Sequence, residues 1–313
     1  MGEIKSNGIP TPRTKGSMGD VYTDTSTGEQ YTCVFAYSSH AGDSDEDYYA
    51  WVKLKDQSGT SAKEPYTEET YDEFGLISLN MVGYEFINRT GLSSMNTLTS
   101  VTIQSGAKTI CDGVFYKCSN LTTVVLPPDM QDISSHAFSE CSNLVLTELP
   151  SGLKSIGAEA FTYCSKLALI ELPSGLTEID NNAFAYCTEL ALTELPPGLA
   201  SISYRAFVGC SNLALTELPS GVTSIGATAF GDCSKLAITE IPSGVTEIQN
   251  IAFQNCIGLT SICFLGTPNN IGSNAFLGCT NLKTIRVPWS KDEVAGAPWG
   301  ATNATIEYEY SGK

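Results

Sequence analysis

Residues 144–166 read LVLTELPSGLKSIGAEAFTYCSK, and this 23-residue unit decides the fold. Eight units of the same length fill residues 98–281. With Leu144 counted as position 1, all eight units carry Leu at position 1, Ile at position 13, Phe at position 18 and Cys at position 21. Self-similarity at a fixed period of about 20–50 residues indicates a repeat architecture. The sequence therefore predicts a solenoid of stacked coils.

The uniform positions predict how each coil folds. Its apolar residues cannot be buried within 23 residues, so neighbouring coils must stack and turn them into continuous interior ladders. Positions 1–6 predict a short strand, and positions 11–13 predict a second extended piece. Proline at position 7, present in six of the eight units, ends the first strand because it offers no amide to a parallel neighbour. The A-F-x-x-C stretch is long enough for one helical turn at most.

Eight of the eleven cysteines form the column at position 21. Neighbouring coils place these thiols about 5 Å apart, but their parallel Cβ vectors disfavour a disulfide. We interpret them as buried structural thiols. A ladder of metal sites is the alternative, and it lacks the CxxC pairs and histidine partners that such sites use. The sequence thus predicts neither a metal nor a cofactor.

The pattern L-x-x-I-x-L-P-x-x-L-x-x-I-x-x-x-A-F-x-x-C resembles the BspA-like (Treponema-type) leucine-rich repeat family of bacterial surface proteins. The resemblance runs from residue 75 to about 310. It implies an α/β solenoid, a right-handed superhelix of 23-residue coils. It also implies adhesion or protein recognition at a cell surface, without identifying the ligand.

Degenerate coils close both ends of the predicted solenoid. Residues 75–97 place Ile87, Leu92 and Met95 in the isoleucine, phenylalanine and cysteine columns, as a capping coil would. Residues 282–313 form the C-terminal cap, with a short helix expected near 290–296 and a strand near 304–310. Trp289 and Trp299 are expected to cover the last coil.

The first 56 residues predict a different unit. Alternating residues around a Ser-Thr-Gly turn indicate a hairpin, and a third strand follows, so 1–56 is a small β module with Tyr22, Tyr31, Tyr48 and Trp51 as its expected core. Residues 57–74 are interpreted as a linker. The module and the C-terminal cap resemble tail-associated proteins of phages and prophages from gut bacteria. The chain begins without the apolar stretch of a signal peptide, which release by lysis from a phage particle would explain.

Composition and motifs exclude several functions. A net charge of −17 repels phosphate backbones, so nucleic acid is not expected as a partner, and no apolar run is long enough to insert into a membrane. His40 and His136 lie near no nucleophile motif, and Cys33 near His40 is most simply a strand residue. The acidic run 43–47 does not fit a calcium loop, because Gly is absent from its sixth position and Glu from its twelfth. We therefore predict a protein without catalytic residues.

One column differs between the middle and the ends of the array. Position 5 is Glu in the five central units and Thr, Val or Cys in the flanking ones. If positions 4 and 6 face the core, strand alternation turns position 5 outward. Position 4 is Thr in four central units, which weakens that orientation, and only Ile170 stays apolar there. The Glu column comprises Glu148, Glu171, Glu194, Glu217 and Glu240.

Position 3 of the same five units is also apolar, as Leu146, Leu169, Leu192, Leu215 and Ile238. Its orientation is open from the pattern. If it points outward, an apolar stripe lies beside the acidic one, as on a protein-binding surface. We predict recognition of a protein or glycan at a bacterial surface, as an adhesin or a phage-type receptor-binding component. The alternatives are an architectural spacer, and recent duplication that copied Glu without selection for a ligand.

Overall fold

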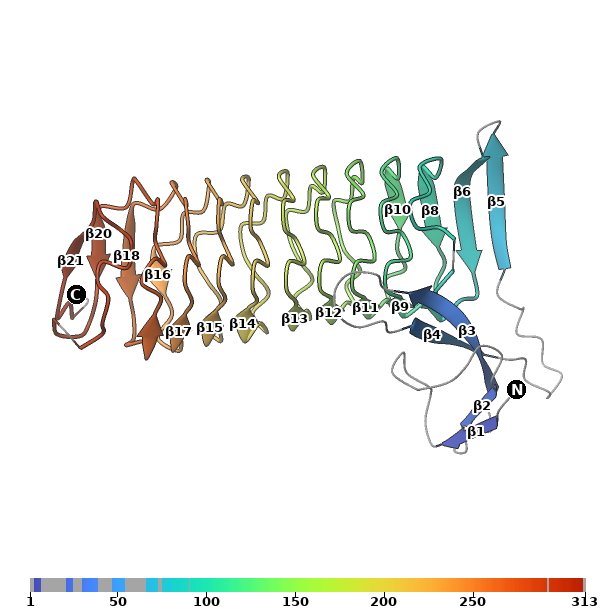
Figure 1. Ribbon diagram of the computed structural model, residues 1–313, viewed down its shortest axis with the longest axis horizontal. Coiled ribbons are helices and arrows are strands. Elements are labelled where there is room, and N and C mark those ends of the chain that lie inside the picture. The colour runs from blue at the N-terminus through green and yellow to red at the C-terminus, as the bar shows by residue number, and fades with distance from the viewer. Residues whose placement is uncertain are drawn as a thin grey trace.

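A computed structural model describes residues 3–6, 21–24, 30–38, 47–53, 66–72, 75–89, 91–291 and 293–311. In Figure 1 the chain winds into a row of stacked coils, each repeating the path of the one before. The predicted solenoid of 23-residue coils is confirmed. Every element assigned in these ranges is a β-strand, so the described coils consist of strands and turns. The helix expected near 290–296 is wrong: its described residues form turns and bends, and Gly296 adopts a φ of +90° that a helix does not accommodate.

One column of strands lies at positions 12 and 13 of every coil. Its members are β7 (Phe86–Ile87), β9 (Thr109–Ile110), β11 (Asp132–Ile133), β12 (Ser155–Ile156), β13 (Glu178–Ile179), β14 (Ser201–Ile202), β15 (Ser224–Ile225), β17 (Glu247–Ile248) and β19 (Asn270–Ile271). These strands pair in parallel in two sheets, of orders β13-β12-β11-β9-β7 and β14-β15-β17-β19, and no pairing joins β13 to β14. Equivalent isoleucines of paired strands lie side by side, as Ile133 and Ile156 do. This confirms the second extended piece of each coil.

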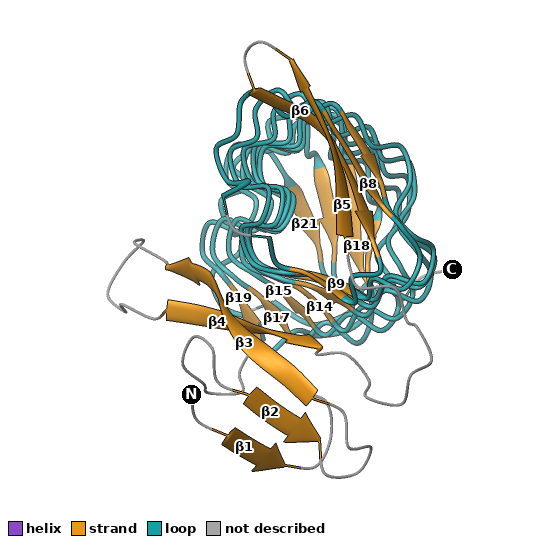
Figure 2. Cartoon of the chain, turned by 90° about the vertical axis from the view of Figure 1, so that its right-hand side faces the viewer, coloured by secondary structure: helices purple, strands orange, loops and turns teal. Residues whose placement is uncertain are grey.

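A second column of strands lies at positions 3–6, but only toward the two ends. It comprises β6 (Gly75–Val82), β8 (Ser100–Ile103) and β10 (Thr123–Val125) at one end, and β16 (Glu240–Ile241), β18 (Ser261–Phe264), β20 (Thr284–Arg286) and β21 (Thr305–Glu307) at the other. Figure 2 looks along the stack and shows the two columns on different sides of the coil. The coils that begin at Leu144, Leu167, Leu190 and Leu213 have no strand at positions 3–6.

The interior consists of the predicted ladders. The phenylalanine rings of successive coils stack nearly parallel from Phe115 to Phe276, with ring centroids 5.2–5.7 Å apart. Each cysteine of the column is buried and unpaired, and its thiol donates to a carbonyl of the preceding coil, as Cys164 does to Phe138 at 3.0 Å. The interpretation as structural thiols is confirmed, because each thiol already has a partner in the core.

The A-F-x-x-C stretch is a turn with two left-handed residues. In the unit 144–166 these are Glu159 (φ 58°) and Tyr163 (φ 60°), on either side of Ala160-Phe161. The turn is tied to the following coil by backbone hydrogen bonds, among them Phe161 N–H to Ala183 C=O at 2.8 Å. Two left-handed residues four positions apart exclude a continuous right-handed helix.

Both ends of the stack are closed by side chains. At the first end Ile87 pairs in register with Ile110, and the backbone carbonyl of Leu92, at the place of a phenylalanine, accepts a hydrogen bond from the Cys118 thiol. Within 57–74, interpreted as a linker, β5 (Tyr66–Asp72) instead pairs antiparallel with β6 and ends the sheet. At the other end Trp289 and Trp299 are buried against Phe264, as predicted.

A separate four-stranded sheet is formed near the N-terminus, in the order β1-β2-β3-β4. Its strands are β1 (Glu3–Ser6), β2 (Val21–Asp24), β3 (Gln30–Ser38) and β4 (Asp47–Lys53). β2 and β3 form the predicted antiparallel hairpin, and β4 pairs with β3 as the third strand. His40 and the acidic residues 43–46 lie outside the described residues, as do the side chains of the expected core Tyr22, Tyr31, Tyr48 and Trp51.

Candidate functional site

The first side of the coil, positions 1–6, has two forms. In the flanking coils position 4 is buried and position 3 is not, as for Val101 beside Ser100 and Ile262 beside Ser261. In the five central coils, which begin at Leu144, Leu167, Leu190, Leu213 and Leu236, positions 3 and 6 are buried. Positions 4 and 5 of the central coils are both exposed.

Strand geometry explains the two forms. Side chains of a strand alternate, so positions 4 and 6 can share the inner face of one continuous strand. Positions 3 and 6 are an odd number of residues apart and cannot. A coil with leucine at both must therefore break its strand and turn two successive residues outward. The Thr–Glu pair of the central coils occupies these two positions.

The position-3 column is therefore a correction to the sequence-based site. Leu146 is 7% exposed, Ile238 is 1% exposed, and Leu169, Leu192 and Leu215 are completely buried. These five side chains belong to the core and form no apolar stripe on the surface. Position 4 is also corrected, because Ile170, expected to face the core, is 64% exposed.

The Glu column does point outward. Glu148, Glu171, Glu194, Glu217 and Glu240 are all exposed. Whether they bind a ligand stays a prediction.

The broken strand leaves backbone groups without partners. Between these coils this side keeps one backbone hydrogen bond per step, from position 2 to position 3 of the coil before, such as Ala191 N–H to Leu169 C=O at 3.0 Å. We call residues 147–149, 170–172, 193–195 and 216–218 the central segments. Their amides and carbonyls form no hydrogen bond with any described residue. Such groups are satisfied only by water or by a ligand.

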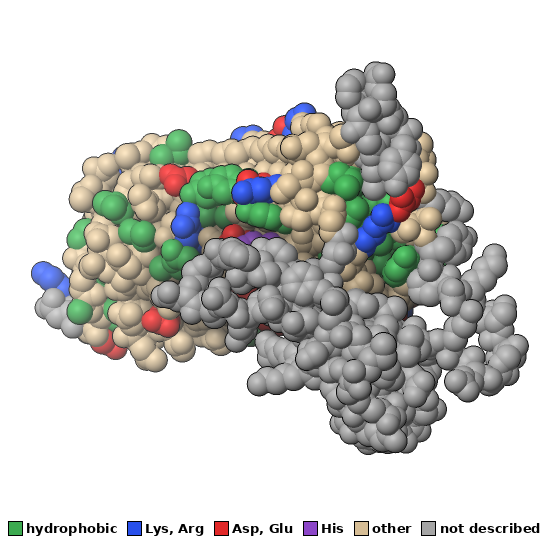
Figure 3. Space-filling model, turned by 45° about the vertical axis from the view of Figure 1, so that its right-hand side comes forward, with side chains coloured by type: hydrophobic (Ala, Val, Ile, Leu, Met, Phe, Trp, Pro, Cys, Tyr) green, Lys and Arg blue, Asp and Glu red, His purple; other side chains and the backbone are tan. Residues whose placement is uncertain are grey.

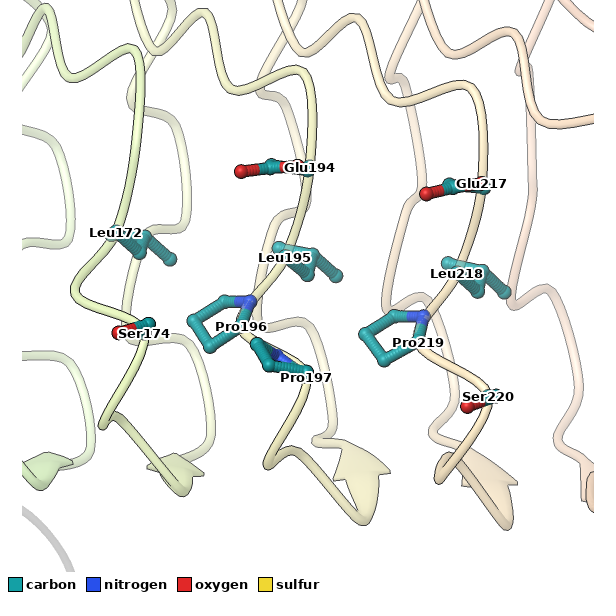
Figure 4. A pocket seen from close by; sticks show the side chains of 10 residues that line it. All are labelled: Leu172, Ser174, Glu194, Leu195, Pro196, Pro197, Glu217, Leu218, Pro219 and Ser220. Atoms are coloured by element: carbon teal, nitrogen blue, oxygen red, sulfur yellow. The ribbon is translucent and has the colours of Figure 1, made fainter.

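Two shallow grooves run over the central segments. One, of about 520 Å³, is bordered by Glu194 and Glu217 and floored by leucines and prolines at positions 6 to 8, as Figure 4 shows. The other, of about 780 Å³, extends from the coil of Val125 to that of Glu194. The Glu–Leu–Pro sequence of the four coils that begin at Leu144, Leu167, Leu190 and Leu213 lines the grooves, and proline at position 7 cannot donate to a neighbouring strand.

The larger groove contains two apolar residues that sequence reasoning missed. Val125 and Val145 are 50% and 51% exposed and line it together with Glu148 and Glu171. Val145 stands at position 2, where other central coils have alanine, so departure from the repeat was the available signal. The groove therefore presents aliphatic and acidic side chains to the same occupant.

The described cysteine thiols are held in their protonated form. Burial raises the pKa of the thiols in the cysteine column, for Cys118 and Cys279 to about 11, which keeps them protonated. Burial, aided by the charge of Asp112, raises the pKa of Cys111 to about 12. The described residues contain no group of three metal-binding side chains. Nor does that part of the chain hold a helix long and apolar enough to cross a membrane.

Known proteins place the chain in a family. The family described as BspA type leucine rich repeat region matches residues 85–214 and 201–296, in six copies. A leucine-rich repeat protein from Bacteroides ovatus is 23% identical, with a TM-score of 0.53 over 80% of this chain and 76% of that one. A leucine rich cell surface protein from Faecalibacterium prausnitzii is 23% identical, with a TM-score of 0.49 over 96% of both chains.

The leucine rich repeat protein of T. pallidum is 27% identical, with a TM-score of 0.43 over 56% of this chain and 90% of that one. No curated protein matches the sequence. The likeness to the Bacteroides protein supports the fold, and the family match extends over well over half of the chain. The chain belongs to the BspA type leucine-rich repeat family.

Proposed function

We propose that this chain is a non-enzymatic binding protein that holds an extended segment of a partner protein in the grooves of its central coils, at a bacterial surface. One observation carries the proposal. In the larger groove, exposed Val125 and Val145 lie beside Glu148 and Glu171 and next to central segments whose backbone forms no hydrogen bond with any described residue. Exposed apolar side chains next to unsatisfied polar groups are the composition of a surface that a partner completes.

The chemistry of the groove defines the partner segment. Aliphatic side chains of the segment would cover the two valines, and lysine or arginine would pair with the glutamates. An extended main chain would supply the donors and acceptors that the central segments lack, as in strand addition to an open sheet edge. The proposed occupant is therefore an extended, basic and aliphatic stretch of a protein.

A peptide-binding experiment tests this proposal. Peptides of alternating lysine and valine are compared with peptides of alternating glutamate and valine. We expect binding of the basic set only. Replacing Glu171, Glu194 and Glu217 by Gln should weaken it on the order of tenfold, since exposed charge pairs contribute about 0.2–1 kcal/mol each. Equal binding of both peptide sets contradicts the proposal.

A matched variant controls for net charge. Glu178→Gln, Glu189→Gln and Glu247→Gln remove the same three charges from other parts of the coil surface. This variant should bind the basic peptides as the wild type does. If both triple variants lose affinity equally, the attraction is one of overall charge, and the grooves are not the site.

The second candidate is an architectural spacer that binds nothing selectively. The uniform stack of Phe rings favours the spacer, because this interior stack holds the coils together whatever side chains the surface carries. Absence of binding to every peptide, together with unchanged assembly on replacing the Glu column, would support the spacer. Antibody labelling of intact cells, compared with purified phage particles, tests the proposed location.

A further inference from the structure

The turn side of the coils carries a cluster of aromatic residues around an arginine. Tyr163, Tyr186, Tyr204 and Arg205 come from three successive coils. The rings of Tyr163 and Tyr186 stack with centroids 4.7 Å apart and planes inclined by 5°. Arg205 Nη2 donates to Tyr186 Oη at 2.8 Å, and its Cζ lies 5.9 Å from the ring centroids of both Tyr186 and Tyr204. Figure 3 shows a face of the stack where hydrophobic and cationic side chains adjoin.

Arg205 is held in place but is not neutralised. It forms no ion pair with a carboxylate of the described residues, whereas Arg89 and Arg286 pair with Glu69 and Glu307. Among the described residues Arg205 donates one side-chain hydrogen bond, to the phenol of Tyr186, so most of its donors remain unused.

The cluster is rigid. Tyr186 lies between the ring of Tyr163 on one face and the backbone of Gly209 on the other, where an added Cβ would come within 2.5 Å of the ring. Tyr163 is nevertheless 50% exposed and Tyr204 45% exposed. A cluster that is fixed by its neighbours and open to solvent loses little freedom when it binds.

The fold does not require these residues. Tyr163, Tyr186 and Arg205 all have φ between 54° and 60°, a conformation that disfavours bulky side chains. Gly209 and Gly278 occupy the position of the two tyrosines in other coils, and Gly113 occupies that of Arg205. Glycine would therefore satisfy the backbone at lower cost. Other coils place Lys117, Glu140, Asp232 or Asn255 at the position of the tyrosines with the same φ, so the backbone does not demand an aromatic ring there.

We propose that Tyr163, Tyr186, Tyr204 and Arg205 form a binding site for a glycan whose sugar rings carry carboxylates. The guanidinium of Arg205 donates to the sugar carboxylate through its free N–H groups, in the paired geometry that suits planar oxyanions. Tyr204 offers ring surface to the C–H face of the sugar. The hydroxyl of Tyr163, which has no hydrogen-bond partner among the described residues, donates to a ring hydroxyl. This site is independent of the groove proposed above.

A glycan fits the cluster better than an acidic peptide does. The grooves over the central segments are lined by positions 2 to 8 of the coil and include none of the four residues of this cluster. Flat, exposed aromatic surface with phenol hydroxyls and one cation suits a ring that presents C–H bonds on its face and hydroxyls at its edge. The charge of Arg205 then selects acidic over neutral sugars.

The probe is a hyaluronan oligosaccharide, which carries a carboxylate on every second sugar, titrated calorimetrically into the full chain. The control ligand is the same oligosaccharide with its carboxylates reduced to hydroxymethyl groups. We expect the acidic form to bind and the reduced form to bind about tenfold more weakly, the effect of losing a charge-assisted hydrogen bond. Equal binding of the two forms, or no binding of the acidic form, overturns the proposal.

Variants locate the binding. Arg205→Gln should remove the preference for the acidic form, while Tyr163→Ala should weaken both forms alike. Lys235→Gln removes one exposed positive charge elsewhere and should change nothing. Equal losses in Arg205→Gln and Lys235→Gln would mean general charge attraction and overturn the site. A competition experiment uses a glutamate-rich peptide against the oligosaccharide. Full competition would mean that the cluster recognises protein carboxylates, and the glycan assignment would fail.

Discussion

The flanking and central coils fold the same core around two different first sides. In the coil that begins at Leu259, positions 3 to 6 form β18, which pairs with β16 and β20. In the coil that begins at Leu190, the same positions form no strand and no ladder. The Phe, Ile and Cys columns continue through both without change. A solenoid can therefore give up one of its strand columns locally, as long as the remaining ladders hold the coils in register.

A one-residue shift of the apolar pattern causes this difference. Ile262 at position 4 keeps the inward residues on one face of a strand, and Leu192 at position 3 does not. The free backbone and the grooves both follow from this shift, and so does the outward direction of Glu194. The candidate surface is a consequence of core packing. Its acidic residues stand at position 5, one of the two successive positions that the central coils turn outward.

Amide hydrogen exchange should show the largest contrast. The amides of Cys263 and Leu265 donate to carbonyls of the preceding coil at 2.8 and 3.0 Å, while those of Thr193, Glu194 and Leu195 donate to no described residue. We expect the first group to exchange at least about a thousandfold more slowly, since core hydrogen bonds open only with large free-energy costs. Equal protection, measured by NMR or mass spectrometry, would abolish the distinction between the two kinds of coil.

Alanine substitution at position 3 should give the next largest effect. Leu192 is completely buried, so Leu192→Ala should lower the free energy of unfolding by about 2–5 kcal/mol. Ser261 at the same position of a flanking coil is only partly buried. Ser261→Ala should therefore change the free energy of unfolding by less than about 0.5 kcal/mol. Urea unfolding followed by circular dichroism measures both. Similar losses would show that position 3 has one orientation throughout.

Position 4 should respond in the opposite way. Ile262→Thr places a hydroxyl in the core and should cost about 1–3 kcal/mol. Thr193→Val changes an exposed side chain and should remain within about 0.5 kcal/mol of the wild type. A large effect of the second change would mean that Thr193 does contact the core.

The smallest expected effect concerns the Glu column itself. Replacing Glu171, Glu194 and Glu217 by Gln removes like charges from one side of neighbouring coils and should raise the thermal midpoint slightly in low salt. The gain should vanish near 1 M salt, where screening acts over about 3 Å. A rise in stability without any loss of peptide binding would identify the column as a product of duplication. A loss of binding with the same rise would identify it as a binding surface that costs stability.

Much of the fold could be predicted from the spacing of residues. The 23-residue period predicted the stack, the isoleucine column predicted β9, β11 to β15, β17 and β19, and the two tryptophans predicted the C-terminal closure. The helix predicted near residues 290–296 was wrong because helix propensity is a local property and does not reveal the turn at Gly296. Strand β5 was missed because its Thr and Glu residues have the composition of a linker, and pairing with β6 supplies what composition does not.

The candidate site shows the boundary most clearly. Sequence alone determined which columns are uniform and that position 5 becomes Glu in five coils, because identity and spacing are properties of the chain. The sequence did not determine whether the side chain of position 3 or that of position 4 enters the core, because the residues of the central coils are compatible with either orientation. The tertiary structure decided this: Leu192 and Leu195 both reach the ladder of neighbouring coils, and a strand cannot bury residues an odd number apart. The broken strand then leaves the backbone of the central segments free.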